Sequence, residues 1–443
     1  MSQTQTSNEG LSNSNWRGSR IIRRVPEVLL REEGNRHDYI PKMVSIGPYH
    51  EGNPELLSAE VFKIIALERF REVHERENLL CYVFIKSKIP EIRNSYERGS
   101  TDRYSDGELT LMMLLDALFI TVCMLEYIAL EQGNIITAEY PSLRLENIAR
   151  MRDHFGPLSI SIAVRDMCLV DNQIPIWLVV LLLSTIVPAP GDAAKILHGY
   201  VSLVLFGELY SAKISFPEWT DESMLHLFDL FYGVLAVFVH EPVEETRSGH
   251  VNWCFGVQER TNADLESGDC CQGKCRLFNK AKGDLKILGH SFHSLTELKA
   301  KGIHLKPSPT QSLLDVKFKS NFMYSELQLP TLSTCLDTKT LFLNMMRYEL
   351  DPQTLSPGVV ISYINLMKLL IVKPEDVKEL REKNILLGFQ GSDEEIVKMY
   401  QDFDTQGVDN PGIYKDVKNR IQAHYNSKIK TWKAKLIHTY FHC

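Results

Sequence analysis

The stretch YIPKMVSIGPYH, residues 39–50, sets the course of the chain before its helices begin. Pro41 and Pro48 fix φ, donate no backbone hydrogen bond and disfavour helix in the residue before each of them. Gly47 permits backbone angles that other residues resist. The stretch therefore predicts a rigid, extended and turned segment near the start of a mostly helical chain, and it contains no catalytic motif.

The composition is that of a globular protein. The chain has 443 residues, of which 44% are hydrophobic and 24% charged, so it holds ample apolar material for a core. Its formal net charge of −7 argues against a basic surface spread over the molecule, so no nucleic-acid partner is predicted. Residues 1–19 are polar, lack the apolar core of a signal peptide, and are predicted to form a disordered tail.

Apolar residues recur at intervals of three and four along much of the chain, which predicts helices. Leu57, Val61 and Ile64 begin such a pattern over residues 56–75. Further helices are predicted to open at Asp106 and Ser392, which are residue types that cap helices. The remaining predicted helices cover residues 140–151, 176–187, 290–301, 338–350, 359–370, 374–383 and 414–441.

The spacing of apolar residues changes from helical to alternating at residues 313–329. There Leu314, Val316 and Phe318 alternate with Asp315 and Lys317, which is typical of a strand. The predicted fold is therefore mainly α: one large multi-helix domain over residues 20–441, with a small β hairpin or sheet near residues 313–329.

Two long apolar stretches predict buried core helices rather than membrane spans. Residues 176–187 are short and lie between Pro175 and Pro188, and residues 111–130 carry Asp116 and Glu126. Nine scattered cysteines imply no disulfide framework. The sequence offers no Asn-x-Ser/Thr acceptor, which favours the cytosolic side.

Residues 241–283 are polar and rich in Gly, Glu and Ser, which predicts a long mobile loop. In and after it lie the residue types that bind zinc. One interpretation is a metal site, and the other is a flexible loop with incidental thiols, which we favour, so no cofactor is predicted. The candidate ligands are Cys270, Cys271, Cys275, His290 and His293.

A second polar set precedes the apolar run at residues 176–187. One interpretation is a binding or catalytic pocket with perturbed ionisation. The other, which we favour, is structural: a buried Arg–Asp pair and an N-cap for the following helix. The set comprises Arg165, Asp166, Asp171 and Asn172, with His50 and Lys63 as a further polar pair.

Enzymatic activity is not predicted. The chain contains no phosphate-binding loop, no dinucleotide fingerprint, no nucleophile elbow and no His-Glu-x-x-His zinc motif. The carboxylates Asp106, Glu108, Asp116 and Glu126 do not all share one helix face, so paired acid–base chemistry is not indicated. An enzyme of unknown class using residues 165–172 remains the alternative.

The predicted helix at residues 414–441 is basic and amphipathic. Either its aromatic and lysine residues lie at a membrane interface, or the helix packs on the core with a solvated lysine face. The residues that would meet a membrane are Lys428, Lys430, Trp432, Lys433, Lys435 and Tyr440.

Several short blocks occur in a set order: RVP at residues 24–26, the stretch at 39–50, RDM at 165–167, NQIP at 172–175, LTEL at 295–298, DVKF at 315–318 and GSDEE at 391–395. This ordered set resembles the plant domain-of-unknown-function family 247, over nearly the whole chain. The motif residues, for which we expect structural roles, are Pro41, Gly47, Pro48, Tyr49, His50, Arg165, Asp166, Asn172, Gln173 and Pro175.

The resemblance implies no established catalytic residues. It favours a non-enzymatic plant recognition or signalling protein that acts through protein–protein contact, in the cytoplasm or peripherally at a membrane. Some similar grass members are linked to pollen-side self-incompatibility, which suggests a male determinant of gametophytic self-incompatibility. Other members are associated with stress or defence, so a stress-response scaffold stays open.

The chain departs from the family pattern in three places. Glu51 follows His50 where the family often doubles the histidine, and Val170-Asp171 replaces the usual pair before Asn172. Family members typically continue into an apolar membrane-spanning helix, whereas this chain ends at Cys443, so membrane anchoring stays open.

Overall fold

The computed structural model describes residues 21–31, 34–132, 151–156, 158–187, 191–206, 225–236, 293–320, 324–333, 338–352, 354, 356–388 and 391–427. Helices predominate in these residues and a small sheet accompanies them, so the predicted mainly α fold is confirmed. The predicted tail at residues 1–19, the loop at 241–283 and nearly all of the helix at 140–151 lie outside the described residues.

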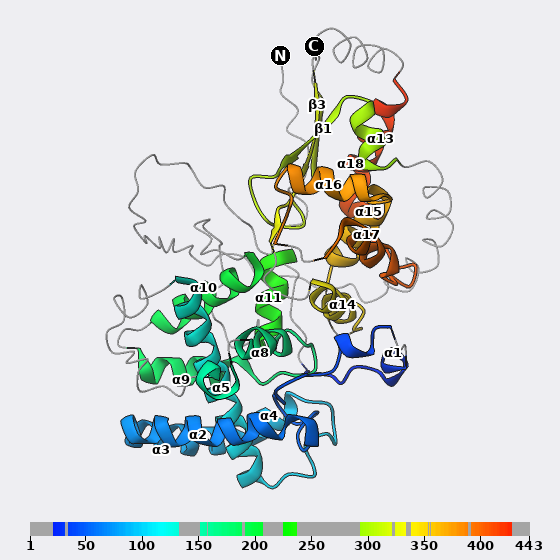
Figure 1. The fold of residues 1–443 in the computed structure, drawn as a ribbon. Coiled ribbons are helices and arrows are strands. Elements are labelled where there is room, and N and C mark those ends of the chain that lie inside the picture. The colour runs from blue at the N-terminus through cyan, green and yellow to red at the C-terminus, as the bar shows by residue number, and fades with distance from the viewer. Residues whose placement is uncertain are drawn as a thin grey trace, which may run out of the picture.

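The N-terminal half of the molecule is built around one long helix, α5 (Asp106–Gln132) (Figure 1). Among the described elements, the helices that pack most closely against α5 are α2 (Leu57–Val73), α3 (Glu75–Ser87), α4 (Ile89–Asn94), α8 (Ser159–Met167), α9 (Ile176–Ile186) and α10 (Asp192–Phe206). The short helices α1 (Glu27–Leu30) and α7 (Met151–Phe155), the helix α11 (Leu227–Ala236), and the 3-10 turns η2 (Arg36–Asp38) and η3 (Pro54–Leu56) also belong to this half.

Helix α5 is long and apolar enough, by length and composition, to cross a membrane. In the structure, 89% of its most apolar window is buried inside the protein. The surrounding helices supply the apolar contacts that a helix hydrophobic on all sides requires. Most of residues 111–130 thus lie in the core, as predicted, while Leu111 and Leu130 at the two ends are exposed.

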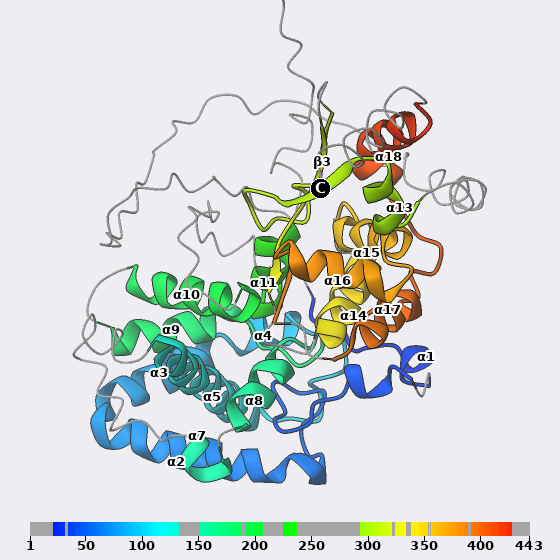
Figure 2. The same ribbon diagram turned by 45° about the horizontal axis from the view of Figure 1, so that its top comes forward.

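The C-terminal half combines further helices with a small sheet at the end of the molecule farthest from α2 (Figures 1 and 2). Its helices are α13 (Leu295–Ala300), α14 (Thr338–Glu349), α15 (Val359–Leu370), α16 (Pro374–Glu382), α17 (Asp393–Asp402) and α18 (Pro411–Tyr425). Its strands are β1 (Ile303–Pro307), β2 (Lys317–Ser320), β3 (Ser325–Leu329), β4 (Leu332–Ser333) and β5 (Leu386–Leu387).

The sheet contains the predicted hairpin and one strand more. β2 pairs antiparallel with β3, and β1 pairs parallel with β3, in the order β1-β3-β2. The predicted strand starts too early, because residues 313–316 form a turn that precedes β2. Asp315 is buried and accepts a hydrogen bond from Thr310, so the alternation at this point reflects a turn rather than a pleat.

One predicted helix end and one predicted cap are wrong for identifiable reasons, whereas α5 begins at Asp106 as predicted. The helix predicted over residues 56–75 ends at Val73, because His74 leaves the helical conformation at φ −132° and ψ 51°. Asp106 does not cap α5: Ser105 accepts from the Glu108 N–H, and Glu108 accepts from the Ser105 N–H. The capping box of Ser392 and Glu395 before α17 is confirmed.

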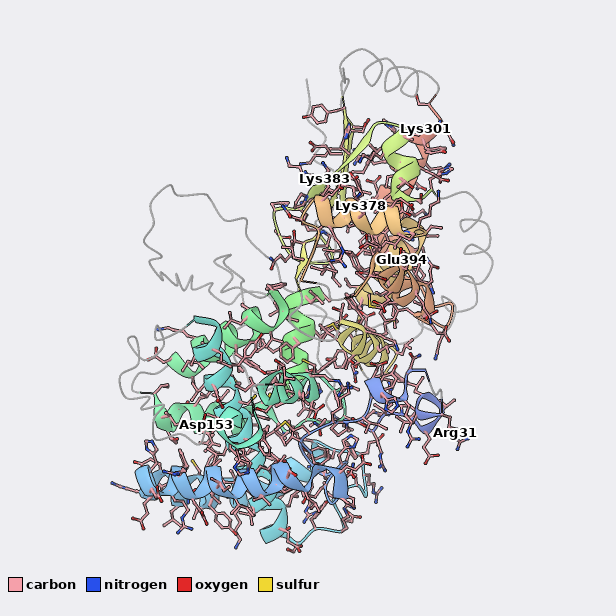
Figure 3. The ribbon with its side chains drawn as sticks, in the orientation of Figure 1. Arg31, Asp153, Lys301, Lys378, Lys383 and Glu394 are labelled. Atoms are coloured by element: carbon pink, nitrogen blue, oxygen red, sulfur yellow. The ribbon has the colours of Figure 1, made fainter. Side chains whose placement is uncertain are left out.

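One hydrophobic cluster runs through both halves, from Ile22 to Ile421. Charged side chains on its outside include Arg31 and Asp153 on the N-terminal half and Lys378, Lys383 and Glu394 on the C-terminal half (Figure 3). Residues 39–50 cross the molecule between η2 and η3, so their polar backbone enters this apolar interior.

Candidate functional site

Residues 39–50, called the strap from here on, follow η2 and lead to η3. Pro41, Gly47 and Pro48 are buried, and Tyr49 and His50 are half-buried. The strap belongs to no sheet, so its buried N–H groups need side-chain partners. Those partners come from α5, from α8 and from the segment after α8. We call residues 165–173 the anchor.

Asp166, on α8, holds the first part of the strap. Its carboxylate accepts hydrogen bonds from the backbone N–H groups of Lys42 at 3.0 Å, Met43 at 2.7 Å and Val44 at 3.1 Å. Burial raises the pKa of Asp166, while these N–H groups and the adjacent Arg165 guanidinium oppose the rise. A single side chain therefore orients three successive residues of the strap.

Asn172 holds the middle of the strap with both ends of its amide. Its Oδ1 accepts from the Ile46 N–H at 2.7 Å, and its Nδ2 donates to the Val44 carbonyl at 3.1 Å. The same Nδ2 donates to the Asp166 carbonyl at 3.0 Å. The side chain thus imitates a neighbouring β-strand, which offers one donor and one acceptor to the facing chain.

A buried ion cluster holds the turn at Gly47. Asp116 on α5 accepts from the Gly47 N–H at 2.7 Å and from Lys63 Nζ at 2.6 Å. Lys63, on α2, is 1% exposed and also donates to the Ser45 carbonyl and to Glu60, each at 2.6 Å. Burial disfavours the ammonium charge, but the two carboxylates outweigh it and raise the pKa of Lys63.

Glu60 is the outer member of this cluster. Burial raises the pKa of its carboxyl from 4.5 to about 7, Lys63 opposes the rise, and the negative charge of Asp116 adds to it. One lysine cannot neutralise two nearby carboxylates, so Glu60 retains its proton to a higher pH than a solvated glutamate does.

Gly47 is the point of closest approach between the strap and the anchor. Its φ is +76°, and a Cβ at this position would lie 2.5 Å from the Gln173 carbonyl oxygen. That carbonyl also accepts from the Tyr96 hydroxyl at 3.0 Å. Glycine is therefore required here both for backbone conformation and for space.

The end of the strap meets the second half of the anchor. His50 Nε2 lies 3.0 Å from Asp171 Oδ1, and Asp171 Oδ2 accepts from the Val25 N–H at 3.0 Å. The Tyr49 hydroxyl donates to the Ile22 carbonyl at 2.7 Å, and its ring packs edge-on against Tyr96. These contacts tie the strap to the segment that precedes α1.

Arg165 and Gln173 complete the anchor. Arg165 donates to Asp166 and to the carbonyls of Ile40 and His37, while its Nε has no partner among the described residues. Gln173 Nε2 donates to the Met167 carbonyl at 2.7 Å, and its Oε1 accepts from a backbone N–H of α11 at 3.3 Å.

Helix α14 joins the strap region to the C-terminal half. Asn344 Nδ2 donates to the Asp38 carbonyl at 2.9 Å, and its Oδ1 accepts from the Val170 N–H at 3.0 Å. Thr340 donates to the Asp38 carboxylate at 2.8 Å. One face of α14 therefore contacts both the residue before the strap and the anchor.

The structure brings Arg165, Asp166, Asp171 and Asn172 together around the strap. Arg165 and Asp166 form a buried ion pair at 2.8 Å, as the structural interpretation predicted, and the other predicted pairings are absent. His50 pairs with Asp171 and Lys63 with Asp116, so His50 and Lys63 are not a polar pair. Neither Asp171 nor Asn172 caps α9. Its N-cap is Pro175, without a side-chain hydrogen bond, because both polar side chains are engaged elsewhere.

Other predicted site residues fall mainly outside the described part of the chain. Cys270, Cys271, Cys275 and His290 lie there, and His293 instead pairs with Glu297 and stacks on Tyr425. No group of three metal-binding side chains occurs within the described ranges. The residues proposed for a membrane interface, 428 to 440, also lie outside them. Within the described residues, α18 ends at Tyr425, with Asn426 as its C-cap.

Sequence reasoning missed how α5 and α14 take part. The ion cluster could have been predicted from Asp116, because a carboxylate within an apolar helix must have a partner, and Lys63 was already a candidate polar residue. Asn344 carries no comparable signal, because a polar residue in an amphipathic helix is ordinary.

The polar side chains of this arrangement hold the backbone of the strap in place. Its carboxylates and amides accept from, or donate to, backbone groups, and its two long cations are paired. Two small cavities of about 10 and 20 Å³ lie nearby, lined in part by Val170, Arg347 and Tyr348 in the first and Tyr39, Leu343 and Arg347 in the second. Neither is lined by His50, Asp166, Asp171 or Asn172.

Comparison with known proteins identifies the class. Residues 22–443 match DUF247, a plant protein family of unknown function, and the chain belongs to that family. It is 26% identical over 434 residues to the UPF0481 protein At3g47200 of Arabidopsis thaliana, covering 95% of this chain and 80% of that protein. It is 20% identical over 435 residues to the putative UPF0481 protein At3g02645 of Arabidopsis thaliana, covering 85% and 76%. No solved structure matches.

Replacing Gly47 by alanine should destabilise the protein by about 2–4 kcal/mol, because left-handed backbone strain adds to the clash with the Gln173 carbonyl. Gly52 is the matched control, since its φ is +83° and nothing lies within 4 Å of an added Cβ. Gly52→Ala should cost only the strain, about 1–2 kcal/mol. Equal losses in chemical denaturation would contradict a close approach at Gly47.

Asp166→Asn should lower the free energy of unfolding by about 3–5 kcal/mol, because an amide cannot accept the same three N–H groups and leaves Arg165 without its carboxylate. Asp153→Asn, on the exposed side of α7, should change it by less than about 0.5 kcal/mol. Urea titration of both variants makes the comparison, and similar midpoints would argue against the role of Asp166.

Glu60 should make stability depend on pH. Its pKa is about 7 in the folded protein and 4.5 when unfolded, so the folded state binds the extra proton between these values. Its stabilising contribution is full below pH 4.5 and is lost as the pH rises through 7. As the pH rises from 4.5 to 7, the melting temperature of the wild type should therefore fall relative to that of Glu60→Gln. Glu68→Gln, a control on the exposed side of the same helix, should follow the wild type. Curves for Glu60→Gln parallel to the wild type would refute the assignment.

Proposed function

We propose that this chain is a non-enzymatic plant recognition or signalling protein that works through protein–protein contact. The observation that carries the proposal is an apolar stripe on α2. Leu57, Val61 and Ile64 are each more than half exposed. Their spacing of four and three residues places them on one face of the helix. Gathered apolar side chains of this kind typically mark a surface that another molecule covers.

The polar anchor supports the non-enzymatic part of the proposal. Asp166, Asn172 and Asp116 accept hydrogen bonds from backbone N–H groups of the strap, so these side chains stabilise the fold. The alternative, an enzyme using residues 165–172, draws on one observation: His50 and Asp171 form the kind of pair that orients a general base. Asp171 also accepts from the Val25 N–H, which favours a structural use of the pair.

The finer roles belong to this proposal as well. A pollen-side determinant of self-incompatibility and a stress or defence scaffold both use recognition, and the family resemblance is what suggests them. We assign partner choice to residues 241–283, and peripheral membrane contact to the lysines and aromatic residues after residue 427. Both segments lie outside the described residues.

The stripe on α2 can be tested by tagging the full chain and comparing what it captures from pollen, pistil and stressed leaf extracts. The double variant Val61→Glu, Ile64→Glu should lose at least about ten-fold of a specifically captured protein, because two charges would be buried at the contact. Val372→Glu, similarly exposed after α15, is the control and should capture normally.

Circular dichroism should show the same helix content in both variants, which separates lost contact from lost fold. Unchanged capture by the α2 variant would overturn the assignment of this stripe. Enrichment from pistil alone would favour the self-incompatibility role, and enrichment from stressed leaf the scaffold.

A further inference from the structure

Helix α3 presents its apolar side chains to solvent. Leu79, Leu80, Val83 and Phe84 are between 44% and 63% exposed. On the opposite face Cys81 and Ile85 are buried, and α3 packs there on α5. Because residues four apart are neighbours on a helix, the pairs 79/83 and 80/84 form one continuous stripe. A soluble helix usually turns such a stripe inward.

The stripe continues onto the neighbouring helix. Phe84 packs edge-on against Trp177 of α9 at 6.0 Å between ring centroids. Trp177, Val180 and Leu181 lie on one face of α9 and are only partly buried. The apolar surface therefore spans two adjacent helices, at the end of the molecule farthest from the sheet (Figure 1).

Charged residues lie at both ends of α3 beside this stripe. Glu75, Arg76 and Glu77 lie in its first turn, and Lys86 and Lys88 lie at its end, where Lys88 pairs with Glu91 at 2.7 Å. Glu75 and Lys86 lie on the same flank as Leu79 and Val83. Turned end for end, this flank presents an acid where it had a base and an apolar side chain where it had an apolar side chain.

We propose that α3 is the centre of a homodimer, in which it packs antiparallel against α3 of a second copy about a two-fold axis. A two-fold interface requires a surface that complements itself. The apolar stripe of α3 can pack on the same stripe of a second copy, and Glu75 of each copy can pair with Lys86 of the other. On one flank Leu79 faces Val83 and Glu75 faces Lys86 of the second copy. On the other flank Leu80 faces Phe84 of the second copy.

The charges favour a second copy over other occupants. Glu75 and Lys86 are both exposed, and neither has an ion-pair partner among the described residues, so each is available to the other copy. An anionic membrane would attract Arg76 and Lys86 but repel Glu75 and Glu77, whereas a second copy offers both Glu75 and Lys86 a partner of opposite charge. The dimer goes beyond the proposed recognition function and uses α3, whereas that function was assigned to α2.

The expected dimer is of moderate strength. A standard stable interface buries about 800 Å² on each partner, more than one helix face provides, so α9 must contribute. We expect a dissociation constant of the order of 10 µM, measured with the full chain by sedimentation velocity between about 1 and 200 µM. Leu80→Glu with Val83→Glu should abolish the dimer, and the α2 variant Val61→Glu, Ile64→Glu should leave it intact.

The charge pattern offers a sharper test, because every side chain acts twice in a symmetric dimer. Lys86→Glu should raise the dissociation constant about ten-fold by placing it against Glu75 of the second copy. Glu75→Lys combined with Lys86→Glu recreates the pair with its charges exchanged and should restore the dimer. Helix content by circular dichroism should be unchanged in all variants.

Three results would overturn the proposal. The first is a chain that stays monomeric at about 200 µM. The second is a dimer that survives Leu80→Glu with Val83→Glu, and the third is failure of the double charge exchange to restore what Lys86→Glu removes. A monomer that binds anionic vesicles or another protein through Leu80 and Val83 would assign the stripe to that occupant instead. None of these outcomes depends on whether capture through α2 is observed.

Discussion

The fold depends on how the strap is accommodated without a neighbouring strand. A buried N–H group without a partner costs about 1–3 kcal/mol, and the strap has five N–H groups to satisfy, three buried and two partly buried. Asp166, Asn172 and Asp116 accept all five. Because these side chains stand on α8, on α5 and after α8, the strap in turn sets how those elements lie against one another. Helix α14 joins the same arrangement through Asn344 and so links the C-terminal half to it.

This constraint separates the polar interior from the surfaces. Lys63 and the carboxylates around it form a cluster that resembles an active site in composition, yet its members contact backbone groups and one another. Apolar side chains also face outward on α2 and α3. Buried polar residues that support the backbone, together with apolar stripes on exposed helices, are the observations on which the proposed recognition role rests.

Sequence patterns predicted much of the fold and less of the site. The helix at residues 359–370 and the capping box at Ser392 follow from local rules, and the structure has both. The helix α3 carries no such pattern, because its apolar residues are divided between a buried and an exposed face. Strand β1 was missed since it pairs in parallel with β3, whose register only the assembled sheet supplies. The anchor residues were recognised as a set, but Asp171 and Asn172 were expected to cap a helix.

The sequence by itself determined the family, the stiffness of the strap and the places where many helices begin and end, because these depend on residue types within a few positions of each other. Only the tertiary structure decided what holds the strap. Val44 and Asp166 are 122 residues apart, and Gly47 and Asp116 are 69 apart. Whether such groups meet depends on how α5 and α8 pack. The requirement for glycine at position 47 likewise depends on tertiary structure, because the Gln173 carbonyl occupies the space that a Cβ would need.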